Sequence, residues 1–480
     1  MQYSSRRQSD QIVKDIQAWG GFPAISFGQR SDPCMGLFSK FMSVFQRKER
    51  FDNIAVTVQA ELPALQGLAK ARDTTSVSNV GQGHRAGAGP VFLGTDTAWL
   101  SEIDPNTMQP HEPVHPKLLH PELKGSLGAA HAMVDPETGD YFGLNMDVGL
   151  SATYRIFRVS ASTGQTTILA TIQEKPAYIH SFFLTRGYVV LCIPVSQYDG
   201  LRAKWEGCLL GGLQGFDENE PCKWFVVDRQ QGRGLIGVFH TPAAFFFHSV
   251  NAFEEEETGD VICELVRYQT TDILFGMYYD VLLNRNGEAK EFWGNPQTAA
   301  RRELHLARYR LRSAELGAQE GSSTRRSVPV AGLELELPGP HAGEMPTINP
   351  AYVCRRHRYV YCLINRGLST LFDSIAKIDT DTREVVSWSG GVGHSPGEAV
   401  FIARPRPKQD ENQAEEALIE PGEDDGVLLS VVLDGHRRSS YLVCLDAKTM
   451  TELGRAECGF AVGFGFHGQH LRSDAERKSV

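Results

Sequence analysis

One turn signal recurs along the chain and constrains its fold more than any other feature of the sequence. In each copy a short apolar run is followed by Asp, Asn or Ser, then a polar pair, then Thr or Gly. Asp and Asn side chains cap such turns through local backbone hydrogen bonds, and Gly supplies a positive φ. The seven copies begin at Ile103, Val134, Val159, Val227, Leu283, Ile378 and Leu445. Seven hairpin signals in one chain favour a radial repeat, with a β-propeller as the leading candidate.

The segments between the turns are rich in Val, Ile, Tyr and Phe, and few long segments have helical periodicity. Short apolar runs bounded by turn residues are typical of β-strands, so we predict an all-β fold. The clearest runs are residues 154–159, 181–195, 223–228, 245–253, 260–268, 278–284, 359–365, 399–403, 426–434 and 440–445. Because the turns are irregularly spaced, a β-sandwich or a pair of all-β domains stays open on this pattern alone.

Three stretches depart from the strand pattern. Residues 310–330 and 404–425 are charged and poor in large apolar side chains, which indicates surface loops or disordered insertions. Residues 202–216 are apolar and contain Gly, so we expect either a satellite cluster over the propeller face or a membrane-contact patch. We predict a single propeller domain over residues 1–480 that carries the two polar insertions.

The composition excludes several classes of protein. A net charge of −10 argues against a nucleic-acid partner, because nucleic-acid-binding proteins usually carry a basic surplus. The nine cysteines are scattered without a C-x-x-C pair, which indicates a reduced, cytoplasmic protein with no zinc ribbon. The N-terminus has no apolar signal segment, and the longest apolar run, residues 188–195, is too short for a membrane span. We expect a monomer, and leave peripheral contact with a membrane or lipid droplet open.

Four of the fifteen histidines lie within or beside apolar strand-like sequence: His131, His180, His248 and His467. Their separations of 49, 68 and 219 residues fit no local metal motif such as H-E-x-x-H. A single buried histidine is more often a satisfied core residue than a metal ligand. A propeller changes this expectation, because inner strands from distant blades converge on one axis.

The sequence around these histidines resembles, in the same order, the four histidine motifs of the carotenoid cleavage oxygenase family. The matching segments are HAMVDPETGDYFGL, IHSFFLTRGYVVL, FHSVNAFEEEETGDVICELVRY and GFHG. Three further segments are similar to family sequence: EMPTINPAYVCRRHRYVYC, GEAVFIARP and EDDGVLLSVVLDG. The resemblance extends from about Ser26 to the end, and FGQRSDPCMGLFSKFMSVF is similar to fungal and other eukaryotic members.

This resemblance implies a seven-bladed β-propeller with Fe(II) on its axis, under a cap of loops and helices that encloses an apolar tunnel. Carried over by motif, the iron ligands are His131, His180, His248 and His467. Four neutral imidazoles suit iron, differ from the commoner set of two histidines and one carboxylate, and leave positions open for O2. The resemblance implies no catalytic side chain beyond this metal site.

A metal-ligating histidine normally donates its other N–H to a carboxylate or a carbonyl, which fixes the orientation of the ring. The family uses acidic residues at three motif positions, and Glu344 and Glu398 match two of them. The third position is Asp96, where Glu is more usual. Since Asp is one methylene shorter, we expect it to reach through a small backbone shift or to orient its histidine less tightly. Apart from the resemblance, Glu344 and Glu398 would be ordinary loop carboxylates, and residues 254–257 a solvated strand end.

The implied reaction is the cleavage of one C=C double bond of a carotenoid or apocarotenoid by O2, which gives two carbonyl products without an external reductant. The phenylalanines of residues 182–183 and 245–247 and the region of Trp205 are the expected tunnel walls. Stilbene-cleaving relatives carry a Lys just before the acidic position matched by Asp96. Thr95 stands there in this chain, which favours a carotenoid, an apocarotenoid or another conjugated apolar substrate over a stilbene.

The chain departs from the family pattern near its start, where no W-F-D-G-like motif is present. We therefore expect the first blade to be incomplete. Two alternatives stay open: a stilbene-cleaving dioxygenase, and a truncated, inactive propeller that binds apolar ligands. The intact set of histidines and glutamates favours an enzyme. A scaffold propeller of the WD type is disfavoured, because blade-by-blade W-D and G-H repeats are absent.

Overall fold

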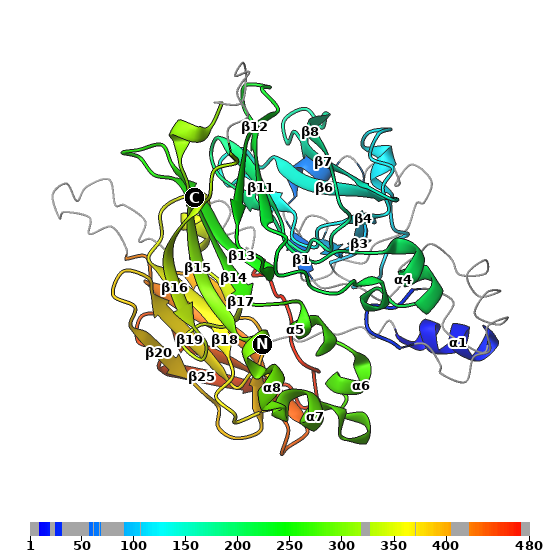
Figure 1. The fold of residues 1–480 in the computed structure, drawn as a ribbon. Coiled ribbons are helices and arrows are strands. Elements are labelled where there is room, and N and C mark those ends of the chain that lie inside the picture. Colours follow the sequence, from blue (N-terminus) through cyan, green and yellow to red (C-terminus); the bar gives the residue numbers. More distant parts are fainter. Residues whose placement is uncertain are drawn as a thin grey trace.

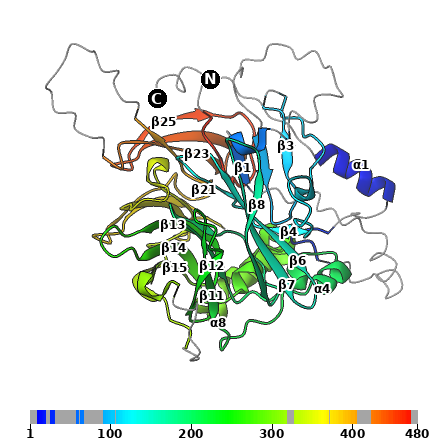
Figure 2. The same ribbon diagram turned by 90° about the horizontal axis from the view of Figure 1, so that it is seen from above.

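In the computed structural model the described residues are 9–19, 25–30, 57–60, 62–66, 68, 91–105, 107–317, 327–369, 371–404 and 422–471. They form six antiparallel β-sheets that stand around a common centre as the blades of a β-propeller (Figures 1 and 2). Each sheet is built mainly from strands that are consecutive in the sequence. In the part of the chain that the structure describes, local hairpins therefore make the blades.

The first three sheets occupy the chain up to residue 241. The first sheet contains β1 (Thr57–Ala60), β2 (Val91–Gly94) and β3 (Ser101–Ile103). The second contains β4 (Leu127–Gly128), β5 (Met133–Val134), β6 (Tyr141–Val148), β7 (Ala152–Val159) and β8 (Thr166–Glu174). The third contains β9 (Phe183–Leu184), β10 (Tyr188–Ile193), β11 (Cys222–Asp228) and β12 (Leu235–Thr241). Three strands are described in the first sheet, whereas the others have four or five.

The last three sheets follow in the same manner. The fourth contains β13 (Phe245–Glu254), β14 (Val261–Tyr268), β15 (Leu304–Leu311) and β16 (Gly332–Pro338). The fifth contains β17 (Glu344–Thr347), β18 (Tyr359–Ile364), β19 (Ser374–Asp379) and β20 (Val385–Trp388). The sixth contains β21 (His394–Pro396), β22 (Val400–Ala403), β23 (Gly426–Asp434), β24 (Ser439–Asp446) and β25 (Glu452–Glu457).

The seven blades that the family resemblance implies are wrong for the described residues, which form six sheets, and the number of turn signals does not give the number of blades either. The signals at Val134 and Val159 turn two successive hairpins of the same sheet, β5–β6 and β7–β8. The signal at Leu283 turns no hairpin at all, since it lies between α6 (Tyr279–Leu282) and the short helix η4 (Arg285–Gly287). Capped turns specify a local reversal of the chain and carry no information about the sheet that follows.

The core lies between neighbouring blades. β10 is buried on both faces because the second and fourth sheets cover it, so its sequence YVVLCI is a continuous apolar run. One cluster joins the third and fourth sheets through Trp224, Phe239 and Tyr309. Full burial of side chains of this size stabilises the fold by about 1.5–3 kcal/mol each. The indole of Trp224 donates to Thr241 Oγ1 at 3.0 Å, so its one polar atom is satisfied inside the cluster.

Most of the described helices lie in two of the loops that connect strands. Between β10 and β11 lie α4 (Gly200–Glu206) and η3 (Leu210–Gly212). Between β14 and β15 lie α5 (Asp272–Phe275), α6, η4, α7 (Glu288–Gly294), α8 (Pro296–Ala299) and η5 (Ala300–Arg302). Helices α5 to α8 cluster at one end of the sheets (Figure 1). Isolated short helices are α1 (Ser9–Trp19), η1 (Pro63–Leu65), η2 (Pro116–Leu118), η6 (Ser313–Glu315) and η7 (Pro350–Tyr352).

The three stretches that depart from the strand pattern have different outcomes. In residues 202–216, Leu209 and Leu210 are each only 1% exposed and belong to the central core cluster, so this segment packs as part of the core. The first polar stretch begins later than predicted, because β15 continues to Leu311, which is fully buried. Residues 318–326 and 405–421 of the two polar stretches lie outside the described residues. Within the described part of the chain, no helix combines the length and apolarity that a membrane crossing requires.

Candidate metal centre

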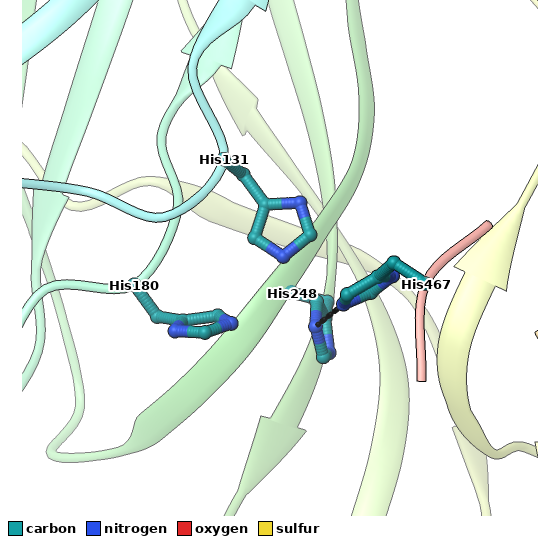
Figure 3. A group of neighbouring side chains, drawn as sticks. All are labelled: His131, His180, His248 and His467. Carbon is teal, nitrogen blue, oxygen red and sulfur yellow. Dashed lines mark hydrogen bonds between the residues drawn. The ribbon is translucent and has the colours of Figure 1, made fainter. Parts of the chain in front are cut away.

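The four predicted histidines come from four separate segments and converge at the centre of the sheets (Figure 3). His131 lies between β4 and β5, His180 just before β9, His248 within β13, and His467 beyond β25. One ring nitrogen from each residue lies within 4.8 Å of the corresponding atom of the other three. The structure thus brings together side chains that are as far apart in the sequence as residues 131 and 467.

The rings are arranged so that nitrogen lone pairs meet at the centre. Neighbouring rings lie 4.6–5.1 Å apart between centroids and meet edge to face, with interplanar angles of 61–89°. The Nε2 atoms of His248 and His467 are 3.2 Å apart. The Nε2 atom of His131 is buried and has no hydrogen-bond partner among the described residues. Buried nitrogen atoms that face one another without a donor between them fit a bound cation.

Three of the histidines present Nδ1 to the three predicted carboxylates. His180 Nδ1 lies 2.7 Å from Asp96 Oδ1, His248 Nδ1 lies 2.5 Å from Glu344 Oε2, and His467 Nδ1 lies 3.0 Å from Glu398 Oε1. Because an ionised carboxylate only accepts hydrogen bonds, we assign the proton of each ring to Nδ1. Nε2 is then left with a free lone pair on the side of the centre. Asp96 reaches its histidine although its side chain is the shorter one.

Each carboxylate also accepts a second hydrogen bond. Glu344 Oε2 accepts from the Met345 amide at 3.0 Å, and the Tyr268 hydroxyl also bonds Glu344. Glu398 Oε2 accepts from the Gly468 amide at 2.9 Å. Asp96 Oδ2 accepts from the Tyr178 hydroxyl at 2.8 Å. These bonds hold the carboxylates in fixed rotamers, so the histidines that they contact are oriented as well.

His131 is held through its backbone, since none of these carboxylates contacts it. Its amide donates to the His180 carbonyl at 3.2 Å. Side chains of β1 bind the carbonyls on either side of it: Thr57 Oγ1 donates to Ala130 at 2.9 Å, and Gln59 Nε2 donates to Ala132 at 2.7 Å. The first sheet therefore positions this histidine although it contributes no histidine of its own.

His248 lies at two consecutive irregularities of β13. Phe246 pairs with Arg267 of β14, Ser249 pairs with Leu265, and Asn251 pairs with Glu264. The register therefore shifts twice, and β13 carries an extra residue on each side of Ser249. Bulges of this kind turn a side chain away from the regular alternation and are common beside active sites.

The pKa shifts favour neutral His131 and His248 and an ionised Glu344. Burial and the proximity of the three other histidines lower the pKa of His131 well below its usual range. Burial also lowers the pKa of His248, and the neighbouring Glu344 offsets this effect only in part. Burial opposes ionisation of Glu344, but His248, Tyr268 and the Met345 amide outweigh it and keep the pKa of Glu344 below normal. A metal requires neutral imidazole, and these histidines provide it.

The predicted aromatic walls divide between two locations. Phe247 meets His180 edge to face with 5.5 Å between ring centroids, and Phe245 contacts both Phe247 and Tyr178. Phe246 belongs to the cluster between the third and fourth sheets, where its ring packs in a tilted arrangement against Phe183. Alternation along β13 explains the division, because successive side chains of a strand point to opposite faces.

The acidic run after His248 serves the fold. Glu254 Oε1 accepts from the Thr185 hydroxyl and from the Gly187 amide, so it caps the turn between β9 and β10. Glu255 forms an ion pair with Arg310 of β15. Neither carboxylate is directed at the histidines, so residues 254 and 255 join neighbouring strands.

Sequence reasoning did not single out Tyr178 or Tyr268. Tyr178 stands two residues before His180, and residues at this spacing share one face of an extended segment. That spacing is the signal that could have found it. Tyr268 carries no such signal, because it reaches Glu344 from another strand, at the end of β14.

A cavity of about 670 Å3 lies beside the segment that leads to His180. Its lining is mainly apolar and includes Ile25, Leu127, Val148, Leu150, Tyr198, Leu201, Lys175 and Lys204. Leu127 and Tyr198 belong to the same buried apolar cluster as Tyr178 and Phe247. The wall of the cavity and the aromatic ring that contacts His180 therefore belong to one apolar cluster.

Comparison with known proteins gives consistent results. Residues 1–472 match the family described as Retinal pigment epithelial membrane protein. A torulene dioxygenase of Fusarium fujikuroi is 42% identical over 98% of this chain and 80% of its own length. A carotenoid dioxygenase of Neurospora crassa is 41% identical over 98% of this chain and 78% of its own length. Cobalt-substituted Synechocystis apocarotenoid oxygenase shares the fold, with a TM-score of 0.65 at 19% identity over 96% of this chain and 82% of that chain.

Proposed function

Since the chain belongs to the family described as Retinal pigment epithelial membrane protein, we propose that it is a dioxygenase that cleaves a C=C double bond of a carotenoid. One observation carries the proposal: four histidine rings, each from a different segment, present ring nitrogens within 4.8 Å of one another. The fungal relatives named torulene dioxygenase and carotenoid dioxygenase support a conjugated polyene as the substrate class.

We assign Fe(II) to this centre, with His131, His180, His248 and His467 as its ligands. The donor set supports a transition metal, because imidazole suits iron and the oxygen-rich sites that Mg2+ or Ca2+ prefer are different. When bound, Fe(II) supplies the redox chemistry that activates O2 toward the double bond. The role of Asp96, Glu344 and Glu398 is to keep the proton on Nδ1, so that each Nε2 faces the metal.

The protein otherwise contributes position and a dry environment. The apolar cluster around Phe245 and Phe247 excludes water beside His180 and offers flat, apolar surfaces to a polyene. The cavity of about 670 Å3 at Leu127 and Tyr198 supplies room for the remainder of an extended substrate. Oxidative cleavage of a double bond requires no general acid or base from the protein, so we assign none.

Thr95 supports a carotenoid over a stilbene. Its side chain is buried, and its hydroxyl is engaged with Thr97, through Oγ1 at 2.7 Å and the amide at 2.9 Å. This position therefore offers no cation to a phenol. A stilbene-cleaving activity remains the second candidate, and it rests on the shared reaction type alone.

The rim of the cavity favours an apolar compartment as the source of the substrate. Leu150 is fully exposed and Leu201 is 79% exposed, although both side chains are large and apolar. Lys175 and Lys204 line the same cavity. We include in the proposal that this rim contacts a membrane or lipid droplet peripherally, since exposed apolar side chains such as Leu150 and Leu201 fit an apolar surface.

The test uses the purified full chain. Iron is measured by elemental analysis, and the protein is incubated in air with torulene, β-carotene, an apocarotenal or a hydroxylated stilbene. We expect near-stoichiometric iron and aldehyde products from a carotenoid, with both oxygen atoms derived from 18O2. Cleavage of the stilbene alone would favour the second candidate. A folded protein that holds no iron and cleaves nothing would leave the inactive, apolar-ligand-binding propeller.

A further inference from the structure

We infer that Tyr178 is a positioning residue for His180 and that it acts through Asp96. The inference rests on the proposed metal centre and adds a group that the histidine motifs do not contain. The hydroxyl of Tyr178 donates to Asp96 Oδ2 at 2.8 Å, and Asp96 Oδ1 accepts from His180 Nδ1 at 2.7 Å. The three side chains form a chain of hydrogen bonds that ends at the imidazole.

The whole chain of hydrogen bonds is shielded from water. Asp96 is 3% exposed, Tyr178 is 4% exposed and His180 is 7% exposed. Among the described residues, the Asp96 carboxylate accepts hydrogen bonds from Tyr178 and His180. Water cannot readily replace a donor at such depth, so loss of the Tyr178 hydroxyl leaves one carboxylate oxygen without a partner.

Each of the other two carboxylates keeps a main-chain donor, even though the Tyr268 hydroxyl also bonds Glu344. Glu344 accepts from the Met345 amide and Glu398 accepts from the Gly468 amide, and both of these donors belong to the main chain. For Asp96 the hydroxyl of Tyr178 takes the corresponding place. Substitution of a single side chain therefore releases Asp96, whereas no side-chain substitution removes the amide donors of Glu344 and Glu398.

Asp96 also decides which tautomer His180 adopts in the presence of this hydroxyl. Tyr178 Oη lies 3.2 Å from His180 Nδ1, close enough for an alternative hydrogen bond to that nitrogen. If the hydroxyl donated to Nδ1, the ring proton of His180 would move to Nε2 and block the lone pair that faces the centre. Because Asp96 accepts from both groups, the hydroxyl proton is directed to the carboxylate and His180 keeps its proton on Nδ1.

The ring of Tyr178 is itself held from several sides. It stacks on Phe245 with 6.2 Å between centroids and meets Phe247 edge to face at 6.4 Å. Its amide donates to the Ser196 carbonyl at 2.9 Å, and Ser196 Oγ donates back to the Tyr178 carbonyl at 2.8 Å. A Tyr178→Phe variant therefore keeps the ring in place and removes the hydroxyl alone.

The experiment compares Tyr178→Phe with Tyr361→Phe, which removes another buried hydroxyl, bonded to the Ala447 carbonyl at 3.1 Å. Metal-free protein is titrated with cobalt(II) alone, and the dissociation constant and the visible cobalt spectrum are recorded. We expect Tyr178→Phe to bind cobalt about tenfold more weakly with an altered spectrum, as is typical when a partner of a metal-ligating histidine is lost. Tyr361→Phe should bind as the unaltered chain does, and both variants should lose similar thermal stability.

A double-mutant comparison tests whether Tyr178 acts through Asp96. In an Asp96→Ala background, Tyr178→Phe should weaken cobalt binding by less than about twofold, since the carboxylate that transmits its effect is already absent. The inference is overturned if Tyr178→Phe alone binds cobalt normally, or if its tenfold loss persists in the Asp96→Ala background. An unaltered chain that binds no cobalt would instead overturn the metal centre itself.

Discussion

His248 lies in the middle of β13, whereas His467 lies on a segment without regular structure that follows the last strand, β25. β13 is paired along its length with β14 and is largely buried. Residues 458–471 are mostly exposed. The candidate metal centre therefore combines a ligand on a rigid inner strand with a ligand on the exposed end of the chain.

The segment that carries His467 is held by separate hydrogen bonds to several parts of the fold and not by a strand ladder. The Glu398 amide donates to the Phe466 carbonyl at 3.3 Å, and the Ala60 amide donates to Gln469 Oε1 at 2.6 Å. The backbones of Gly465 and Gly397 also approach closely: a Cβ atom on Gly397 would lie 3.0 Å from the Cα atom of Gly465. Segments with few buried contacts open at lower free energy than core strands. We therefore expect substitutions that remove hydrogen bonds of this segment to displace His467. The position of His248 should depend more on the packing of β13.

The largest expected effects come from removing the histidines themselves. His248→Ala should abolish iron binding and cleavage, and it should also lower the free energy of unfolding by about 2–3 kcal/mol, because the charged Glu344 stays buried without its partner. His467→Ala should abolish iron binding as well, with a smaller loss of stability, since the side chain of its partner Glu398 is 14% exposed and that of Glu344 is 5% exposed.

Elemental analysis and urea unfolding of the metal-free variants measure the two quantities separately. Full iron content and activity in His248→Ala would refute its assignment as a ligand. An equal fall in the free energy of unfolding in the two variants would show that the histidine on β13 and the histidine on the terminal segment contribute alike to stability.

The carboxylates give the next largest contrast. Glu398 uses its two oxygens for two different donors, His467 and the Gly468 amide, so Glu398→Gln loses one of these bonds. Glu344 receives His248 and the Met345 amide on the same oxygen, so the single oxygen of Glu344→Gln can serve both, and the Tyr268 hydroxyl can accept from the new NH2 group. We expect iron affinity to fall about 10–100-fold in Glu398→Gln and less than about tenfold in Glu344→Gln. Iron titration of metal-free protein measures both, and the reverse order would contradict the hydrogen-bond assignment.

A smaller effect is expected from the anchor beside His467. Gln469→Ala removes the acceptor of the Ala60 amide, so iron affinity should fall about fivefold, the equivalent of one neutral hydrogen bond of about 1 kcal/mol. Gln173→Ala removes an exposed bond to Thr153 and serves as the control. The same iron titration applies, and an unchanged affinity in Gln469→Ala would show that this contact does not position His467.

The smallest effect on the metal is expected from Asp96→Glu. Asp96 already contacts His180 and Tyr178 at normal distances, so a longer side chain gains no bond. The extra methylene must fit into a buried site, and we expect a loss of about 1 kcal/mol in the free energy of unfolding with iron content preserved. Thermal unfolding and elemental analysis check the two parts, and a large loss of iron would show that Asp96 tolerates no change in reach.

The sequence predicts the candidate site better than it predicts the number of blades. His131, His180, His248 and His467 stand in short segments that can be recognised individually, and each is found at the centre. The capped turns are equally local, but they report only that the chain reverses. Two of them fall within one sheet and another lies among helices, so their number could not give the number of sheets.

The features of the site that could not be predicted from the sequence depend on contacts between residues far apart in the chain. Tyr178 and Asp96 are separated by 82 positions, and their contact depends on how the first and third sheets approach the centre. Phe246 and Phe247 are neighbours with the same side chain, yet only Phe247 faces the histidines. The direction of each phenylalanine depends on the register of β13 against β14, which the sequence of one strand does not specify.

The two bulges of β13 make the metal centre sensitive to the number of residues in this strand as well as to their identity. Removing a single residue near Ser249 would eliminate one of the two bulges and shift the pairing with β14 by one residue, so the side chains on one side of the deletion would exchange faces. His248 would then turn away from the other histidines although every ligand remained in the chain. Insertions and deletions at this point should therefore be far rarer among active homologues than in the turns at the outer ends of the sheets.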